Sequence, residues 1–128
     1  MENKASKNWI LLDFGELKLS AKLFDTRIAR EFFAQIPVSI ELVAWGDEYY
    51  GSIGADLGVE SPVSEIPAGG LAYTNRGRYV CIFFGQTPAW PVEHIGMIDG
   101  EGWRQLRETK PQACTIYPQP VQFSTEIK

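Results

Sequence analysis

Gly77-Arg-Tyr-Val-Cys-Ile-Phe-Phe-Gly-Gln-Thr-Pro88 is the stretch that decides the fold of this chain. Its centre, Tyr79 to Phe84, is apolar or aromatic throughout, and turn-forming residues stand on either side. Continuous hydrophobicity is typical of a strand covered on both faces, and so short a run is more typical of a strand than of a helix. The sequence therefore predicts a central buried strand, which the rest of the chain must cover.

Length and composition indicate a globular protein. The chain has 128 residues, enough for one domain with its own core, and 45% of them are hydrophobic. A formal net charge of −4 provides no basic field for a polyanion, so nucleic acid is not expected as a partner. We expect one domain over residues 1–128, with a polar N-terminal lead (1–8) and a C-terminal extension (118–128).

The cysteines and the N-terminus bear on the compartment. Cys81 and Cys114 lie in strand-like segments, and a small disulfide-stabilised domain normally has more cysteines, so two reduced, buried thiols are predicted. Residues 1–8 lack the apolar run of a signal peptide, and no window approaches a membrane span. These features predict a cytoplasmic protein without membrane contact.

The first part of the chain shows strand patterns around one helix. Residues 9–14 are apolar apart from Asp13, and residues 16–23 alternate apolar with polar side chains, which predicts a hairpin. A helix is expected over residues 25–36, with apolar positions four apart and Pro37 as its end. Residues 38–45 are then rich in β-branched and apolar side chains, which favours another strand.

The second part repeats short strands between Gly- and Pro-rich turns. A strand that begins near Tyr49, or a bent continuation of the preceding one, is followed by loops up to residue 70. Further strands are expected at 71–74, 79–84, 94–98 and 113–117, a helix at 102–110, and a weak edge segment at 121–123. About eight short strands with two helices exclude a parallel doubly wound sheet and favour an antiparallel barrel or sandwich.

Catalytic and metal-binding patterns do not stand out. His94 is the only histidine and no Cys-x-x-Cys pair exists, so neither a metal site nor any other cofactor is expected, and a structural role is favoured for His94. Carboxylates between Asp47 and Glu65 could gather on one rim for acid/base chemistry, but solvated surface is the favoured interpretation in an acidic protein. We therefore assign no catalytic residues.

Aromatic residues near turns are the one sequence feature that indicates a possible binding site. They are Trp45, Tyr49, Tyr50, Tyr73, Tyr79 and Trp90. Amphipathic rings at strand ends can line a cleft for an apolar or peptide ligand, and they are equally common as half-buried packing. The sequence leaves both interpretations open.

The central stretch and its surroundings resemble the cyclophilins. A strand entered from Gly77 and ending near Thr87, with Trp90 shortly after, is followed by a strand carrying Gly96 and then a helix from Gly102. Residues 45–50 together with 83–88 resemble more closely the atypical cyclophilin-like family of small prokaryotic proteins, whose function is unestablished. The resemblance implies a mainly β fold, a closed eight-stranded antiparallel barrel capped by two short helices.

The residues to which cyclophilin catalysis is attributed are not matched in this sequence. Cyclophilins are held to speed prolyl isomerisation with an arginine that donates to the proline nitrogen, and the corresponding residues 47–52 contain no arginine. An ungapped comparison puts Cys81 in place of the pocket phenylalanine and Tyr79 in place of a backbone-binding glutamine. Alternation along the strand predicts Tyr79, Cys81 and Phe83 on the ligand face and the residues between them in the core.

The resemblance therefore implies a binding protein without efficient isomerase activity. We expect its groove to take a peptide segment or a small molecule and to be lined by Tyr50, Tyr73, Tyr79, Cys81 and Trp90. Two alternatives stay open. One is a peptidyl-prolyl isomerase that uses Arg76 or Arg78, and the other is an enzyme of different chemistry that uses Glu48 with His94.

Overall fold

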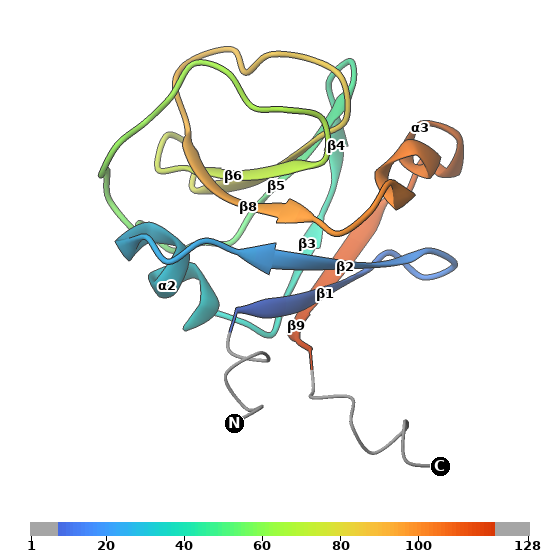
Figure 1. The fold of residues 1–128 in the computed structure, drawn as a ribbon, viewed down its shortest axis with the longest axis horizontal. Coiled ribbons are helices and arrows are strands. Elements are labelled where there is room, and N and C mark those ends of the chain that lie inside the picture. Colours follow the sequence, from blue (N-terminus) through green and yellow to red (C-terminus); the bar gives the residue numbers. More distant parts are fainter. Residues whose placement is uncertain (1–7, 120–128) are drawn as a thin grey trace.

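The computed structural model describes residues 8–119, and these form one nine-stranded antiparallel sheet that curves into a barrel (Figure 1). The strands follow one another in space as β3-β9-β1-β2-β8-β6-β7-β5-β4. Their bounds are Trp9–Asp13 (β1), Lys18–Leu23 (β2), Val38–Glu41 (β3), Val43–Ala44 (β4), Glu48–Ser52 (β5), Gly70–Thr74 (β6), Tyr79–Phe83 (β7), Glu93–Ile98 (β8) and Ala113–Pro118 (β9). The mainly β barrel predicted from the sequence is confirmed.

Nine strands stand where eight were expected, because residues 38–45 change partners midway. β3 pairs with β9, whereas β4 pairs with β5, and the segment turns away from β9 at Leu42. The barrel is nearly closed there, since β3 and β5 approach so closely that a Cβ on Gly51 would collide with the Glu41 carbonyl oxygen. The predicted edge segment 121–123 lies outside the described residues, as do residues 1–7 of the lead and 120–128 of the extension.

Helix α2 (Arg27–Phe33) covers one end of the barrel (Figure 1). Thr26 begins it, because its Oγ1 accepts a hydrogen bond from the Ala29 amide at 3.2 Å. The apolar stripe of the helix, Ile28 and Phe32 in particular, is buried in the barrel core. The second predicted helix is present as a 3₁₀ turn, η1 (Gly102–Gln105), that runs into α3 (Leu106–Thr109).

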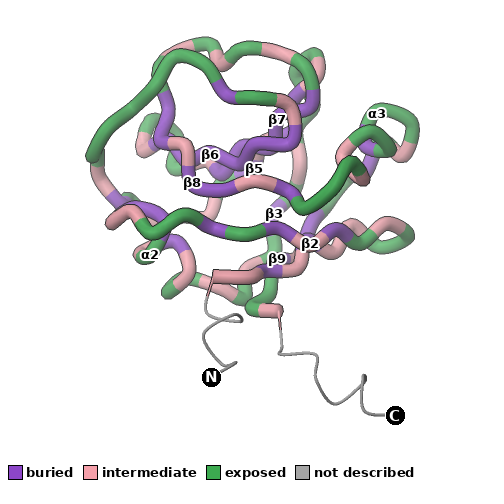
Figure 2. Tube along the Cα trace, in the orientation of Figure 1, coloured by how far each residue is buried: buried purple, intermediate pink, exposed green. Residues whose placement is uncertain are grey.

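β7 lies between β5 and β6 and is buried along most of its length (Figure 2), and its side chains form two different faces. Val80, Ile82 and the following Phe84 belong to the main core inside the barrel. Cys81 and Phe83 point the other way, into a second apolar cluster with Tyr79 at its border. The predicted division of this strand into a core face and an outer face is confirmed.

The long connection between β5 and β6 lies against the barrel without regular structure of its own. The Glu93 carboxylate accepts hydrogen bonds from the amides of Glu60 (2.7 Å) and Ser61 (2.9 Å). The Glu60 carboxylate in turn accepts from the amides of Arg27 and Ile28 at the start of α2. Two carboxylates therefore fasten this loop to β8 and to the helix.

Candidate ligand-binding site

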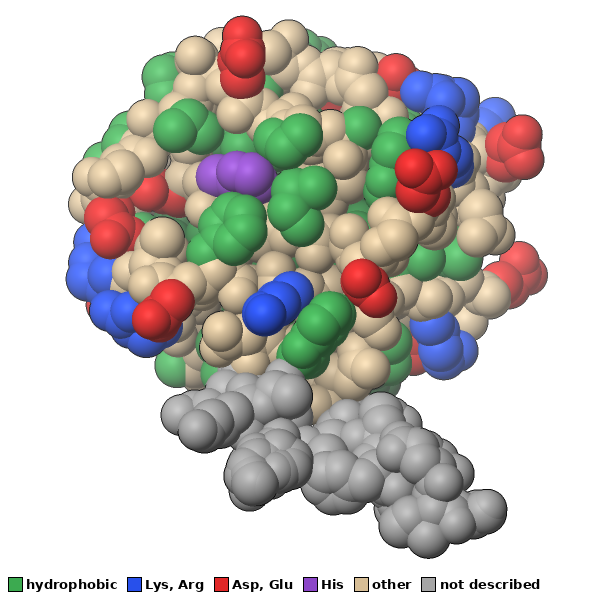
Figure 3. All heavy atoms as spheres, viewed as in Figure 1, with side chains coloured by type: hydrophobic (Ala, Val, Ile, Leu, Met, Phe, Trp, Pro, Cys, Tyr) green, Lys and Arg blue, Asp and Glu red, His purple; other side chains and the backbone are tan. Residues whose placement is uncertain are grey.

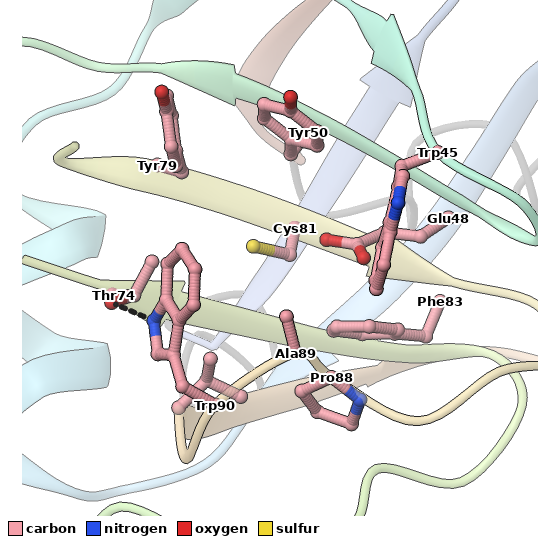
Figure 4. A pocket seen from close by; sticks show the side chains of 11 residues that line it. Trp45, Glu48, Tyr50, Thr74, Tyr79, Cys81, Phe83, Pro88, Ala89 and Trp90 are labelled. Carbon is pink, nitrogen blue, oxygen red and sulfur yellow. Dashed lines mark hydrogen bonds between the residues drawn. The ribbon is translucent and has the colours of Figure 1, made fainter. Parts of the chain in front are cut away.

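A cavity of about 360 Å³ opens on the outer face of the barrel, over β5 and β7 (Figure 4). Its floor comes from paired strands, and its far wall comes from the segment between β7 and β8. The lining residues are Trp45, Glu48, Tyr50, Thr74, Tyr79, Cys81, Phe83, Pro88, Ala89, Trp90 and Val92. Apolar and aromatic side chains thus surround a small number of polar groups, as in most small-molecule sites.

The register of β5 and β7 builds the floor. Tyr50 is opposite Cys81, and Glu48 is opposite Phe83, so these side chains project from the same face of the sheet. The ring of Tyr50 packs against that of Tyr79, with centroids 4.7 Å apart. Because the opposite face of both strands is locked into the barrel core, the floor is rigid.

Trp90 forms the wall and is held on two sides. Its Nε1 donates a hydrogen bond to Thr74 Oγ1 of β6 at 3.0 Å, which Figure 4 shows as a dashed line. The Arg76 guanidinium stacks over the same indole, 3.8 Å from the ring centroid. The indole is therefore fixed in position before any ligand arrives.

The rim at Trp45 is linked to the segment after β7. Gln86 Oε1 accepts a hydrogen bond from the Asp47 amide at 2.7 Å, and a Cβ on Gly46, whose φ is +62°, would collide with that same oxygen. The Phe84 amide donates to the Asp47 carbonyl at 2.9 Å. Trp45 itself is 47% exposed, so an aromatic side chain stands at the mouth of the cavity.

Glu48 places a carboxyl group inside this apolar cavity. The residue is only 5% exposed, and burial raises its pKa from 4.5 to about 7, an effect partly offset by a hydrogen bond from the Cys81 thiol. No Lys, Arg or His is found among the described residues that line the cavity. The carboxyl group therefore has a thiol beside it and no positive charge.

The two cysteines are buried free thiols, as predicted. Burial raises the pKa of Cys81 far above its ordinary range, and the neighbouring Glu48 raises it further. Burial likewise raises the pKa of Cys114 to about 12. Both thiols stay protonated at neutral pH, so neither has the thiolate character of a nucleophile.

Four of the five predicted site residues come together in this cavity, namely Tyr50, Tyr79, Cys81 and Trp90. Tyr73 does not line it. Its side chain is fully buried in the main core, where the hydroxyl donates to the Ala55 carbonyl at 2.6 Å and accepts from the Leu57 amide at 2.9 Å. Tyr73 holds the loop after β5.

The sequence interpretation missed Glu48 as a cavity residue. The signal was available in the strand itself, because Glu48 and Tyr50 are two residues apart and must share a face of β5. Thr74 follows by the same rule, since it and Tyr73 point to opposite faces of β6. Glu48 was interpreted as part of a solvated acidic surface, and Thr74 only as the end of a strand.

His94 and the two arginines of the alternative hypotheses lie outside the cavity. The His94 ring packs edge-on against the Phe24 ring, with the two ring centroids 4.8 Å apart. Figure 3 shows the histidine among apolar side chains on the surface of the barrel. Its Nε2 is buried without a hydrogen-bond partner, and burial lowers its pKa. Arg76 lies behind Trp90, along a second depression of about 230 Å³, and Arg78 follows it with a φ of 59°.

Residues 8–119 contain neither a cluster of metal ligands nor a membrane-spanning helix. In this part of the chain no three or more His, Cys, Asp or Glu side chains gather in a way that could hold a metal ion. None of the helices in the same residues has the length and hydropathy needed to cross a bilayer.

The barrel and its outer-face cavity define the chain as a protein of the cyclophilin fold class. The sequence profile described as Cyclophilin-like matches residues 8–116. The chain therefore belongs to the Cyclophilin-like family, which confirms the resemblance seen in the sequence.

Two solved structures share the fold. The hypothetical protein AF2241 from Archaeoglobus fulgidus, solved in solution, has a TM-score of 0.72 and 21% identity, with 87% of this chain and 94% of that chain covered. McbB, solved in complex with tryptophan, has a TM-score of 0.68 and 14% identity. The match covers 86% of this chain and only 44% of McbB. A search of curated proteins found no match.

Proposed function

We propose that this protein binds a small organic ligand, through an aromatic or other apolar ring, in the cavity over β5 and β7. The observation that carries the proposal is the lining itself. Trp45, Tyr50, Tyr79, Phe83 and Trp90 converge on one space from rigid strands and from a tethered loop. A preformed aromatic site loses little conformational freedom on binding, which favours affinity.

The size of the cavity favours a small molecule over a peptide segment. At about 360 Å³ it lies at the lower end of the range for small-molecule sites. A ring system with a short substituent would fill it. A peptide would fit only with a single side chain in the cavity and the rest of the segment across the rim near Trp45.

Efficient prolyl isomerisation is not part of the proposal. Catalysis of that kind needs a donor aimed at the proline nitrogen, and β5 contributes Glu48 and Tyr50 to the cavity instead of an arginine. The alternative is an isomerase that uses Arg76 or Arg78, and neither residue lines the cavity. To reach the cavity, Arg76 would have to give up its contact with the outer side of Trp90.

A titration tests the proposal directly. McbB is described in complex with tryptophan, and an indole is therefore a reasonable first probe, so we choose tryptophol, a neutral indole alcohol. Calorimetric titration should give saturable binding with one site per chain. Replacing the exposed, cavity-lining Ala89 with Trp should fill the space and abolish that binding.

The matched control is Thr87→Trp, two residues away in the same loop and outside the lining. It places the same large side chain on the same exposed segment and should leave the affinity within about twofold of the parent. The proposal would be wrong if tryptophol bound the Ala89→Trp variant as tightly as the parent, or if no binding to the parent were found.

A further inference from the structure

The Glu48 carboxyl group is a titratable group inside an apolar site, and no opposite charge lies among the described residues that line that site. The residue is only 5% exposed, and its side chain points into the cavity between Cys81 and Trp45 (Figure 4). The thiol of Cys81 lies beside it, and its influence on the carboxyl pKa only partly offsets that of burial. Such a group is costly to keep ionised unless a donor or a cation completes its surroundings.

The neighbouring ion pair shows that the chain satisfies its other carboxylate at this edge. Asp47, next in sequence, has its carboxylate 2.7 Å from the Arg107 guanidinium on the far side of the strand. Glu48 faces the cavity and is left without a counterpart in the described residues that line it. The missing partner is therefore expected to come from the ligand.

The aromatic rings around the carboxyl group suit a positive charge. In Figure 4 Tyr50 lies on one side of Glu48, Phe83 on the other, and Trp45 in front of it. The faces of such rings attract cations, most strongly when water is excluded. A protonated amine placed here would meet a carboxylate that accepts its hydrogen bonds and ring faces that favour its charge.

We propose that the cavity selects ligands that carry a protonated amine on a short chain beside an aromatic ring, with Glu48 as the group that binds the amine. This inference rests on the proposed function and names the class of ligand. The ring would occupy the space between Tyr79 and Trp90, and the ammonium group would lie at Glu48. The class is that of the arylalkylamines.

The proposal predicts a pH dependence of binding. Burial raises the pKa of Glu48 to about 7, so the carboxylate forms as the pH rises through neutrality, whereas an alkylammonium group stays protonated up to about pH 10. The titratable groups that face Glu48 are Cys81 and Tyr79 from β7 and Tyr50 from β5, and β6 contributes only the neutral Thr74. None of these adds a positive charge. Amine binding should therefore strengthen between pH 6 and pH 8.

Calorimetry with tryptamine and tryptophol, which differ only in amine against hydroxyl, tests the inference. At pH 8 we expect tryptamine to bind at least about tenfold more tightly than tryptophol. This preference should fall to about one in Glu48→Gln and should shrink at pH 6 in the parent chain. Asp47→Asn, which neutralises a carboxylate outside the cavity, is the matched control and should keep the preference.

The outcomes separate the two proposals. Equal affinities for the two probes, or a preference that persists both in Glu48→Gln and at pH 6, would overturn the amine inference and leave the binding proposal standing. If neither probe bound the parent chain, both proposals would fail. The pH series in the parent does not depend on how well the variant folds, and tryptophol binding by Glu48→Gln reports that its cavity is intact.

Discussion

Glu48 is the residue at which this chain departs most from an apolar binding site. It lies on the rung of β5 opposite Phe83, so the pairing of β5 and β7 forces its carboxyl group into the cavity. The same pairing removes it from water and thereby raises its pKa to about 7. The residue therefore costs stability in the free protein when it ionises, and this cost is measurable.

Replacing Glu48 with Gln should stabilise the protein relative to the parent as the pH rises. The folded-state pKa lies above the unfolded value of 4.5, so the folded state holds the proton more tightly. The stability that the parent protein gains from keeping Glu48 protonated is fully present below about pH 4.5 and is lost as the pH rises through 7. Urea unfolding at pH 5 and pH 8 should show the variant gaining about 1 to 3 kcal/mol on the parent. A difference that is the same at both pH values would contradict the assignment.

Which single residues line the site could largely be predicted, because successive side chains of a strand point to opposite faces of the sheet. The rule separated Tyr79, Cys81 and Phe83 from the core residues between them, and the structure agrees. The rule alone does not say which face of β6 is the outer one, and so Tyr73 was expected in the groove. The environment of Glu48 comes from residues distant in sequence, so its pKa could not be inferred from the sequence.

The loop between β5 and β6 depends on single side chains for its position. Tyr73 bridges two of its backbone groups, the Leu57 amide and the Ala55 carbonyl, from inside the core. Glu93 and Glu60 hold it from the β8 side and from α2. Two side chains of the barrel, Tyr73 and Glu93, thus reach the backbone of this loop, and the loop's own Glu60 reaches the first amides of α2.

The Tyr73→Phe substitution should weaken this loop without affecting the cavity. Removing the hydroxyl leaves a buried amide and a carbonyl unpaired, so we expect the free energy of unfolding to fall by about 1 to 3 kcal/mol. The exposed Tyr117 offers a control, because Tyr117→Phe should change stability by less than about 0.5 kcal/mol. Tryptophol affinity should be unchanged in both. If only the Tyr73→Phe variant lost affinity for tryptophol, Tyr73 would have to contribute to the ligand site.

The bounds of the helices and strands were harder to predict from the sequence than their types. The opening hairpin and the first helix could be predicted from their hydrophobic periods, and the central strand from its short, continuous apolar run between turn residues. The division of residues 38–45 into β3 and β4 was not, because it results from a change of partner between β9 and β5. Partner choice is a tertiary property that local sequence does not encode.

In the whole molecule, the two faces of the barrel wall formed by β5 and β7 have different roles. The inner side of β5 and β7 completes the main core, and the outer side carries the cavity, so the same strands provide stability and the site. The fold could be predicted because the chain follows the cyclophilin order of elements. The ligand could not, because related barrels share a scaffold while each site depends on a few outward-facing side chains.

The central claim is that ligands enter the cavity over β5 and β7. The most direct test is to follow the backbone amide resonances of the full chain by ¹H–¹⁵N NMR while tryptophol is added. We predict that the saturable shifts concentrate in residues 48–52, 79–83 and 88–92. Shifts confined to another surface, such as the depression beside Leu42 and Arg107, or no saturable shifts at all, would contradict the account.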